Sequence, residues 1–277
     1  MKKMIITGRI FYASALFVYG LQQLYFGTFR DVFFSPYQDY LPLLNVFSYL
    51  FGLYLMVTAV LLFVHGKGRK AALVLGCVLM ALFLGTHISY QLISQPNKLY
   101  HLGLWTTPLK ALALAGGAFV IAHSFGADNG AKPSLLERFA PYGNLLFLYT
   151  MTSFGISHMI YAPYLASTVP AWMANHEFWV LLTGVTLTAS GIAIILGLRI
   201  RIISLFLALQ IFLWVWLVHV PGTLSYPLAA NRGNLLASAF DALAFSGTAL
   251  LIALTMKKQQ WIEDIEHWGD DKKLEQA

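Results

Sequence analysis

Long apolar runs recur along the whole chain, and they restrict its possible folds more than any other feature. A helix needs about 20 apolar residues to cross the hydrocarbon core of a bilayer. Runs of this length lie at 8–27, 43–65, 71–93, 106–126, 142–163, 177–197, 202–221 and 233–254. They are continuously apolar, whereas the strands of a membrane barrel alternate in polarity. Because the chain is also 58% hydrophobic and only 11% charged, we predict an all-α polytopic membrane protein with eight transmembrane helices.

The first apolar run follows basic residues, as the apolar region of a secretory signal peptide does. It lacks a small-residue cleavage site and continues through Leu24 and Tyr25, so we predict a retained first helix. The single cysteine, Cys77, lies inside the third run. A disulfide within the chain is therefore excluded.

Lysine and arginine residues are distributed unevenly between the two sides of the predicted helices. Most lie at the N-terminus, in the even-numbered connections and in the tail, and only Arg30, Lys98 and Arg232 lie on the other side. The positive-inside rule then places both termini in the cytoplasm, and we expect a bacterial inner membrane. The net charge of +6 is explained by this orientation, and no nucleic acid is expected as a partner. Nucleotide-binding glycine motifs are absent from the sequence.

The chain contains an internal repeat. The stretches "KALALAGGAFVIA" and "DALAFSGTALLIA" are similar, and Arg69 and His87 recur as Arg201 and His219 with the same spacing. This pattern predicts a tandem duplication of a four-helix unit. Because each unit crosses the membrane an even number of times, a pseudo-twofold axis along the membrane normal should relate the two. The predicted parts are a first unit at 1–126, a cytoplasmic linker at 127–141, a second unit at 142–254 and a cytoplasmic polar tail at 255–277.

The two similar stretches begin with opposite charges, Lys110 and Asp241. Both residues are expected at matching depth in the outer half of the bilayer, where a lone charge costs about 2.5–3.5 kcal/mol on insertion scales. Equivalent positions meet if their helices line the pseudo-twofold axis. We therefore predict an ion pair between the two units, which could serve packing alone or form part of a ligand site.

Further polar residues share the predicted outer half. They are His87, His219, His158, Gln23 and Tyr90. We predict that some of them line a cavity that opens toward the outer leaflet, where with the charged pair they could hold a polar head group or relay protons. Each histidine taken alone could equally form an ordinary hydrogen bond between helices. The spacings predict no metal site, and no residue is identified as catalytic.

The repeated unit resembles the DoxX/DoxD-like membrane proteins. The resemblance rests on a glycine-bearing first helix, a basic turn between helices two and three, a histidine at the end of helix three, and a fourth helix of the form charged-x-Leu-Ala-x-x-Gly. It covers two tandem copies, at 8–126 and 142–254. The resemblance implies a membrane subunit of a thiosulfate:quinone oxidoreductase, with a quinone as cofactor and a redox partner subunit. Relatives often carry a lysine near the end of helix one, where this chain has Gln23 and His158.

Two functions remain open from the sequence. The first is a quinone- or lipid-binding membrane subunit of a redox system, in which the charged pair and the outer histidines contact the head group. The second is a non-enzymatic membrane protein that binds or transports a lipid or a small solute.

Overall fold

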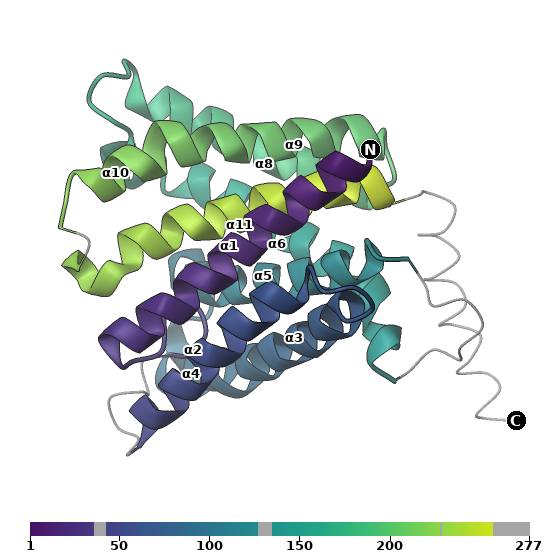
Figure 1. Ribbon diagram of the computed structural model, residues 1–277. Helices are drawn as coiled ribbons and strands as arrows, with labels where there is room; N and C mark the ends of the chain where they lie inside the picture. The colour runs from purple at the N-terminus through teal and green to yellow at the C-terminus, as the bar shows by residue number, and fades with distance from the viewer. Residues whose placement is uncertain (36–42, 127–134, 228, 257–277) are drawn as a thin grey trace, which may run out of the picture.

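The structure is a computed structural model that describes residues 1–35, 43–126, 135–227 and 229–256. These residues form helices and connections, without a strand (Figure 1). The long helices are α1 (Lys2–Phe26), α2 (Leu44–Leu61), α3 (Gly68–Leu82), α5 (Thr106–His123), α6 (Gly143–Ile160), α8 (His176–Ile195), α9 (Ile200–Trp214) and α11 (Asn234–Thr255). The short elements used below are η2 (Phe83–Ile88), α4 (Ser89–Ser94), η4 (Leu102–Trp105), η5 (Leu135–Tyr142), α7 (Ala162–Leu165), η7 (Val215–His219), α10 (Val220–Leu224) and η8 (Ala230–Gly233).

Seven helices in the described part of the chain are long and apolar enough to cross a membrane. The fifth run, expected as one helix over 142–163, differs from the prediction. Helix α6 ends at Ile160, and the chain bends by 90° into α7. Pro163 explains the bend, because proline has no N–H group with which to continue the helix. Counted with this bent pair the spans number up to eight, and the chain is confirmed as an all-α polytopic membrane protein.

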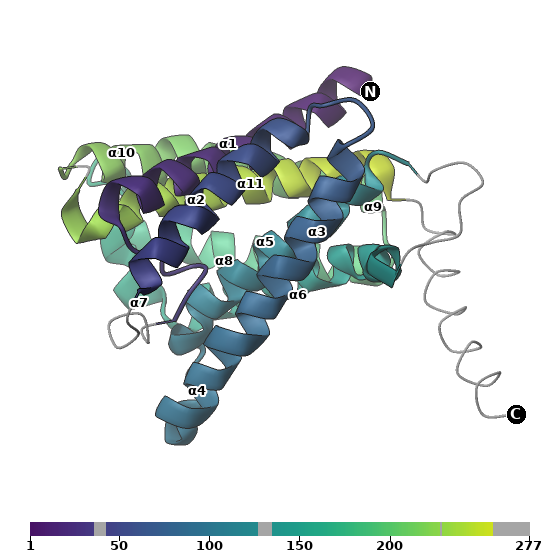
Figure 2. The same ribbon diagram turned by 60° about the horizontal axis from the view of Figure 1, so that its bottom comes forward.

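The helices pack in a pattern that occurs twice. Helix α1 packs against α2 as α6 packs against α8, and α3 packs against α5 as α9 packs against α11. Helix α1 also packs against α11 as α6 packs against α5, and α5 meets α11. Figures 1 and 2 show α11 beside α1, and α5 among α3, α6 and α11. A tandem duplication around a pseudo-twofold axis predicts this pairing; the exact unit boundaries stay predictions.

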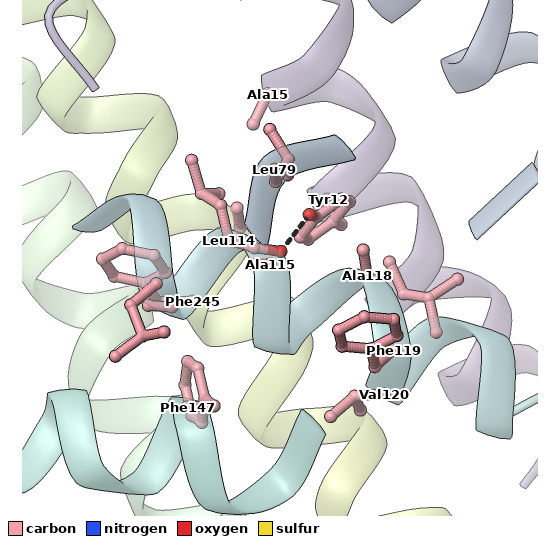
Figure 3. Close-up of a cluster of buried hydrophobic side chains, with 14 of the residues drawn as sticks. Tyr12, Ala15, Leu79, Leu114, Ala115, Ala118, Phe119, Val120, Phe147 and Phe245 are labelled. Atoms are coloured by element: carbon pink, nitrogen blue, oxygen red, sulfur yellow. Dashed lines mark hydrogen bonds between the residues drawn. The ribbon is translucent and has the colours of Figure 1, made fainter. Parts of the chain in front are cut away.

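Helices α5 and α11 form the centre of the bundle and are buried over most of their length. They are rich in alanine and glycine, and such small residues allow membrane helices to approach closely. Figure 3 shows Tyr12 of α1, Leu79 of α3, Phe147 of α6 and Phe245 of α11 around the buried side chains of α5. The Tyr12 hydroxyl donates a hydrogen bond to the carbonyl oxygen of Leu114. The charged residues of α5 and α11 therefore lie in the interior of the protein.

Equivalent glycines bring the outer helices of each unit together. A Cβ atom on Gly20 of α1 would lie 2.5 Å from the carbonyl oxygen of Gly52 in α2. The same distance separates a Cβ atom on Gly155 of α6 from the carbonyl oxygen of Gly184 in α8. Both helix pairs are thus in backbone contact, which only glycine permits.

The two ends of the bundle differ in what they carry. The end away from the N-terminus, called the far end here, consists of residues 27–35, α4, η4, α10 and η8 (Figures 1 and 2). At the opposite end, Arg69 pairs with Glu137 of η5 at 3.0 Å. This contact fixes the described part of the predicted linker beside the turn between α2 and α3. The rest of the linker and nearly all of the predicted tail lie outside the described residues.

Candidate functional site

Lys110 and Asp241 form an ion pair between α5 and α11. The Lys110 Nζ atom lies 3.0 Å from Asp241 Oδ2, and the side chains are 23% and 4% exposed. The predicted pair is therefore confirmed. Lys110 also donates a hydrogen bond to Ser238 Oγ at 3.1 Å, and the Tyr19 hydroxyl of α1 donates to the second oxygen of Asp241. Because Tyr19 is fully buried, the carboxylate is held on both of its oxygens inside the protein.

A second polar group lies next to this pair at the far end. Arg232 pairs with Asp31 Oδ1 at 2.9 Å, and Asn234 Nδ2 donates to Asp31 Oδ2 at 2.8 Å. The neighbouring Arg30 is fully buried, and its Nη2 atom lies 3.4 Å from Asn234 Oδ1. These contacts join the segment after α1 to the start of α11. The contacts therefore connect the first predicted unit to the second.

Arg30 is held in an unusual setting for a guanidinium. Its carbon Cζ lies 5.0 Å from the centre of the Phe26 ring, while its Nε and Nη1 atoms have no hydrogen-bond partner among the described residues. Burial lowers the pKa of the Arg30 guanidinium, although Asp31 acts in the opposite direction. An arginine remains charged in proteins even so. A full positive charge with unused donors therefore lies inside the far end.

Two cavities open among these residues. The smaller, of about 190 Å³, lies between residues 30–32, α5 and α11, and its wall includes Arg30, Lys110, Asn234 and Asp241. The larger, of about 360 Å³, lies between the segment after α1, α4, η4 and α5. Asp31 and Thr107 belong to the walls of both cavities. The cavities are therefore neighbours at one end of the molecule.

The larger cavity contains two of the predicted site residues, His87 and Tyr90. His87 lies in η2, a π-helical segment, and its Nε2 atom is 3.1 Å from the carbonyl oxygen of Val32. The equivalent His219 lies in a second π-helical segment, η7. Such segments are rare and frequently occur at functional sites, and their repetition at both histidines was not predicted.

The remaining predicted residues, His158, His219 and Gln23, do not line either of these cavities. The Nδ1 atom of His158 is 2.7 Å from the carbonyl oxygen of Phe154 in its own helix. His219 interacts electrostatically with Lys110, Asp241 and His158, and so lies beside the charged pair. Gln23 is fully buried, and both of its side-chain polar atoms lack partners among the described residues. The predicted polar residues at the larger cavity are thus His87 and Tyr90, and a ligand-binding role for Gln23, His158 and His219 stays a prediction.

Several residues of the site were missed by the sequence reasoning. The sequence patterns do not single out Tyr19, Asp31 and Asn234, and they identify Arg30 and Arg232 only as charges that indicate orientation. The adjacent Arg30 and Asp31 in a short connection between apolar runs were the available signal. Their contacts with α11 depend on the packing of the first helix against the last, which the sequence does not show directly.

The metal-ligating residue types do not gather in this region. Among the residues that the structure describes, no three histidine, cysteine, aspartate or glutamate side chains are grouped so that they could hold a metal ion. The chemistry available at the far end is hydrogen bonding and charge.

Comparison of the chain with protein-family models, curated proteins and solved structures gave no match. The resemblance to the DoxX/DoxD-like proteins thus remains a prediction from the residues.

Proposed function

We propose that this protein binds the polar head group of a membrane-soluble ligand, a quinone or a lipid, in the two cavities at the far end. The observation that carries the proposal is the Lys110–Asp241 ion pair, which is buried between the central helices and also forms part of a cavity wall. A pair that served packing alone would not need to border open space. Ionisable residues inside a membrane bundle commonly mark a ligand or ion site.

Lys110 is well placed to contact a ligand. An ammonium group has three donor hydrogens, and the structure gives Lys110 two acceptors, Asp241 and Ser238. The remaining donor is available to a carbonyl oxygen of a quinone or to an oxygen of a lipid head group. Asp241, which is itself bound by Tyr19, holds the lysine side chain in place.

The family resemblance supports a specific version of this proposal. The protein would be a DoxX/DoxD-like membrane subunit that holds a quinone for a quinone-linked oxidoreductase, with the electrons supplied by a partner subunit. The bacterial inner membrane and cytoplasmic termini belong to the same proposal, because the basic residues gather on the N-terminal side. No residue of this chain is assigned a catalytic role.

One observation favours the alternative, a non-enzymatic protein that binds or transports a lipid or small solute. The charged residues in the two cavity walls are Arg30, Lys110, Arg232, Asp31 and Asp241, which together carry one excess positive charge. A neutral quinone ring does not balance this charge, whereas an anionic lipid does.

The experiment that tests the proposal is solvent extraction of the purified protein. Quinone is measured from the ultraviolet difference spectrum on borohydride reduction, and lipid is measured by mass spectrometry. The test variant is Lys110→Met with Asp241→Asn, which removes both charges and leaves no unpaired charge behind. Lys98→Met is the matched control, because Lys98 is exposed on the same side of the protein.

We expect the wild type and the control to retain a quinone or a specific lipid that the double variant loses. Loss of quinone supports the redox subunit, and loss of lipid alone supports the alternative. Equal retention of both compounds by all three proteins contradicts the proposed site.

A further inference from the structure

The smaller cavity has the features of an anion site, and the first of these is the state of Arg30. This side chain is fully buried, yet its Nε and Nη1 atoms have no partner among the described residues. Buried donors in proteins are nearly always paired. Arg30 also forms part of the wall of the cavity of about 190 Å³, so a residue with unused donors borders this cavity.

The neighbouring carboxylates are already engaged by other groups. Asp241 is bound by Lys110 and Tyr19, and Asp31 is bound by Arg232 and Asn234. No carboxylate lies at ion-pair distance from Arg30 in the described part of the chain. Among the described residues of this cavity wall, Arg30 is therefore the cation without a carboxylate partner.

Hydrogen-bond donors other than Arg30 border the same space. Lys110, Thr107 and Ser238 belong to the cavity wall, and Lys110 retains one donor beyond its two acceptors. Oxygen atoms of a phosphate or carboxylate accept such hydrogen bonds, and ionised partners make them stronger. Asp31 and Asp241 in the wall would repel a doubly charged ion, so a single negative charge fits the balance best.

We propose that Arg30 and Lys110 bind a singly charged oxygen anion in the smaller cavity, either the phosphodiester of an anionic lipid or a free inorganic phosphate. The inference rests on the proposed function in using the same cavity, and it adds the charge of the ligand and the residue that recognises it. The lipid would place its phosphate by Arg30 at the far end, and the adjoining cavity of about 360 Å³ would accept the rest of the head group.

The test uses the full chain, freed of lipid in an uncharged detergent. One arm adds inorganic phosphate against potassium chloride at equal ionic strength, and the other places the protein in nanodiscs of phosphatidylcholine with or without phosphatidylglycerol. Binding is read from the thermal unfolding temperature in the first arm and from native mass spectrometry in the second. The variants are Arg30→Gln and Arg30→Lys, with Lys98→Gln as the control for loss of one positive charge.

We expect saturable binding of one of the two probes, weakened at least about tenfold by Arg30→Gln, less by Arg30→Lys, and not at all by Lys98→Gln. Binding of phosphatidylglycerol alone identifies a lipid, and binding of phosphate alone identifies a soluble anion. The inference is overturned if neither probe binds the wild type saturably, or if Arg30→Gln binds as tightly as Lys98→Gln. If Arg30→Gln does not fold, the comparison uses Arg30→Lys in its place. The inference is then overturned if Arg30→Lys binds the probe as tightly as Lys98→Gln, or if the wild type does not bind it saturably.

The outcome can be separated from that of the solvent extraction. A quinone lost from the Lys110→Met, Asp241→Asn variant while Arg30→Gln keeps full anion binding would support the proposed function and overturn this inference. If the purified protein retains no quinone or lipid but binds an anion in a way that depends on Arg30, the result would support this inference and contradict the proposed function.

Discussion

Asp241 is held by a cation on one oxygen and by a phenol on the other. Lys110 supplies the first contact from α5, and Tyr19 supplies the second from α1. The position equivalent to Tyr19 in the second unit is Phe154, which cannot donate a hydrogen bond. Asp241 therefore has a phenol partner from the first unit, whereas Lys110 has no equivalent phenol from the second unit.

The ion pair predicts a specific pattern of stability. Lys110→Ala or Asp241→Ala alone should lower the free energy of unfolding by about 3–5 kcal/mol, because each leaves a buried charge without its partner. The exchanged double mutant, Lys110→Asp with Asp241→Lys, should recover much of this loss. The hydroxyls of Tyr19 and Ser238 can each donate or accept, so both suit the exchanged charges. Thermal unfolding in detergent measures the effect.

The exposed pair of Arg232 and Asp31 provides the control for this experiment. Its side chains are 47% and 39% exposed, so Arg232→Ala should cost no more than about 1 kcal/mol. If the exchanged protein is as unstable as the sum of its two single mutants, Lys110 and Asp241 act separately.

Two fully buried tyrosines on α1 should respond differently to loss of their hydroxyls. Tyr19→Phe removes a donor from a carboxylate and should cost about 1.5–3 kcal/mol, whereas Tyr12→Phe removes a bond to the neutral carbonyl of Leu114 and should cost about 0.5–1.5 kcal/mol. Chemical or thermal unfolding of the two variants in the same detergent compares them. An equal cost would mean that Asp241 does not depend on its phenol partner.

The sequence was sufficient to predict the ion pair but not the whole site. Lys110 and Asp241 could be predicted to pair for two reasons. The repeat places them at equivalent positions, and a lone charge inside the bilayer has a high free-energy cost. Arg30 and Tyr19 could not be placed, because their roles depend on how α1 and the segment after it pack against α11. Such contacts between the ends of a chain leave no spacing pattern in the sequence.

At the scale of elements, the helices were predicted better than their irregularities. The break after α6 could have been anticipated from Pro163, which cannot continue a helix. The π-helical segments at His87 and His219 could not, since they add one residue to a turn without a change in composition. His87 in the first segment contacts the carbonyl oxygen of Val32, and His219 is its equivalent in the second unit.

The close approach of α1 to α2 and of α6 to α8 predicts that alanine is not tolerated there. Gly20→Ala and Gly155→Ala should each cost about 1–3 kcal/mol of stability, because the added methyl group would meet a backbone oxygen 2.5 Å away. Gly222→Ala in α10 is the matched control, since its added methyl group meets nothing within 4 Å. Unfolding temperatures of the three variants make the comparison, and equal stability of all three would contradict the packing described here.

At the scale of the whole molecule, the two ends differ in the number of their basic residues. The far end contains Arg30 and Arg232, but Asp31 pairs with Arg232 at 2.9 Å, so part of its positive charge is neutralised. The N-terminal end contains Lys67 in the turn before α3, Lys70 in the first turn of α3, and other basic residues. There too one charge is neutralised, because Arg69 pairs with Glu137 at 3.0 Å. The remaining basic residues still outnumber those at the far end, and this difference favours a cytoplasmic N-terminal end.

This charge difference predicts how single cysteines will react in intact bacteria. In a Cys77→Ala background, cysteines at Tyr100 and Tyr226, which are 77% and 61% exposed at the far end, should react with a membrane-impermeant maleimide. Cysteines at Lys67 and Leu198, both exposed at the opposite end, should react only after the membrane is permeabilised. The reverse pattern would contradict the orientation. Tyr100 belongs to the first unit and Leu198 to the second. Labelling of positions 100 and 198 from the same side of the membrane would contradict the parallel arrangement of the two units. In that arrangement the first unit crosses the membrane an even number of times, which places the two positions at opposite faces.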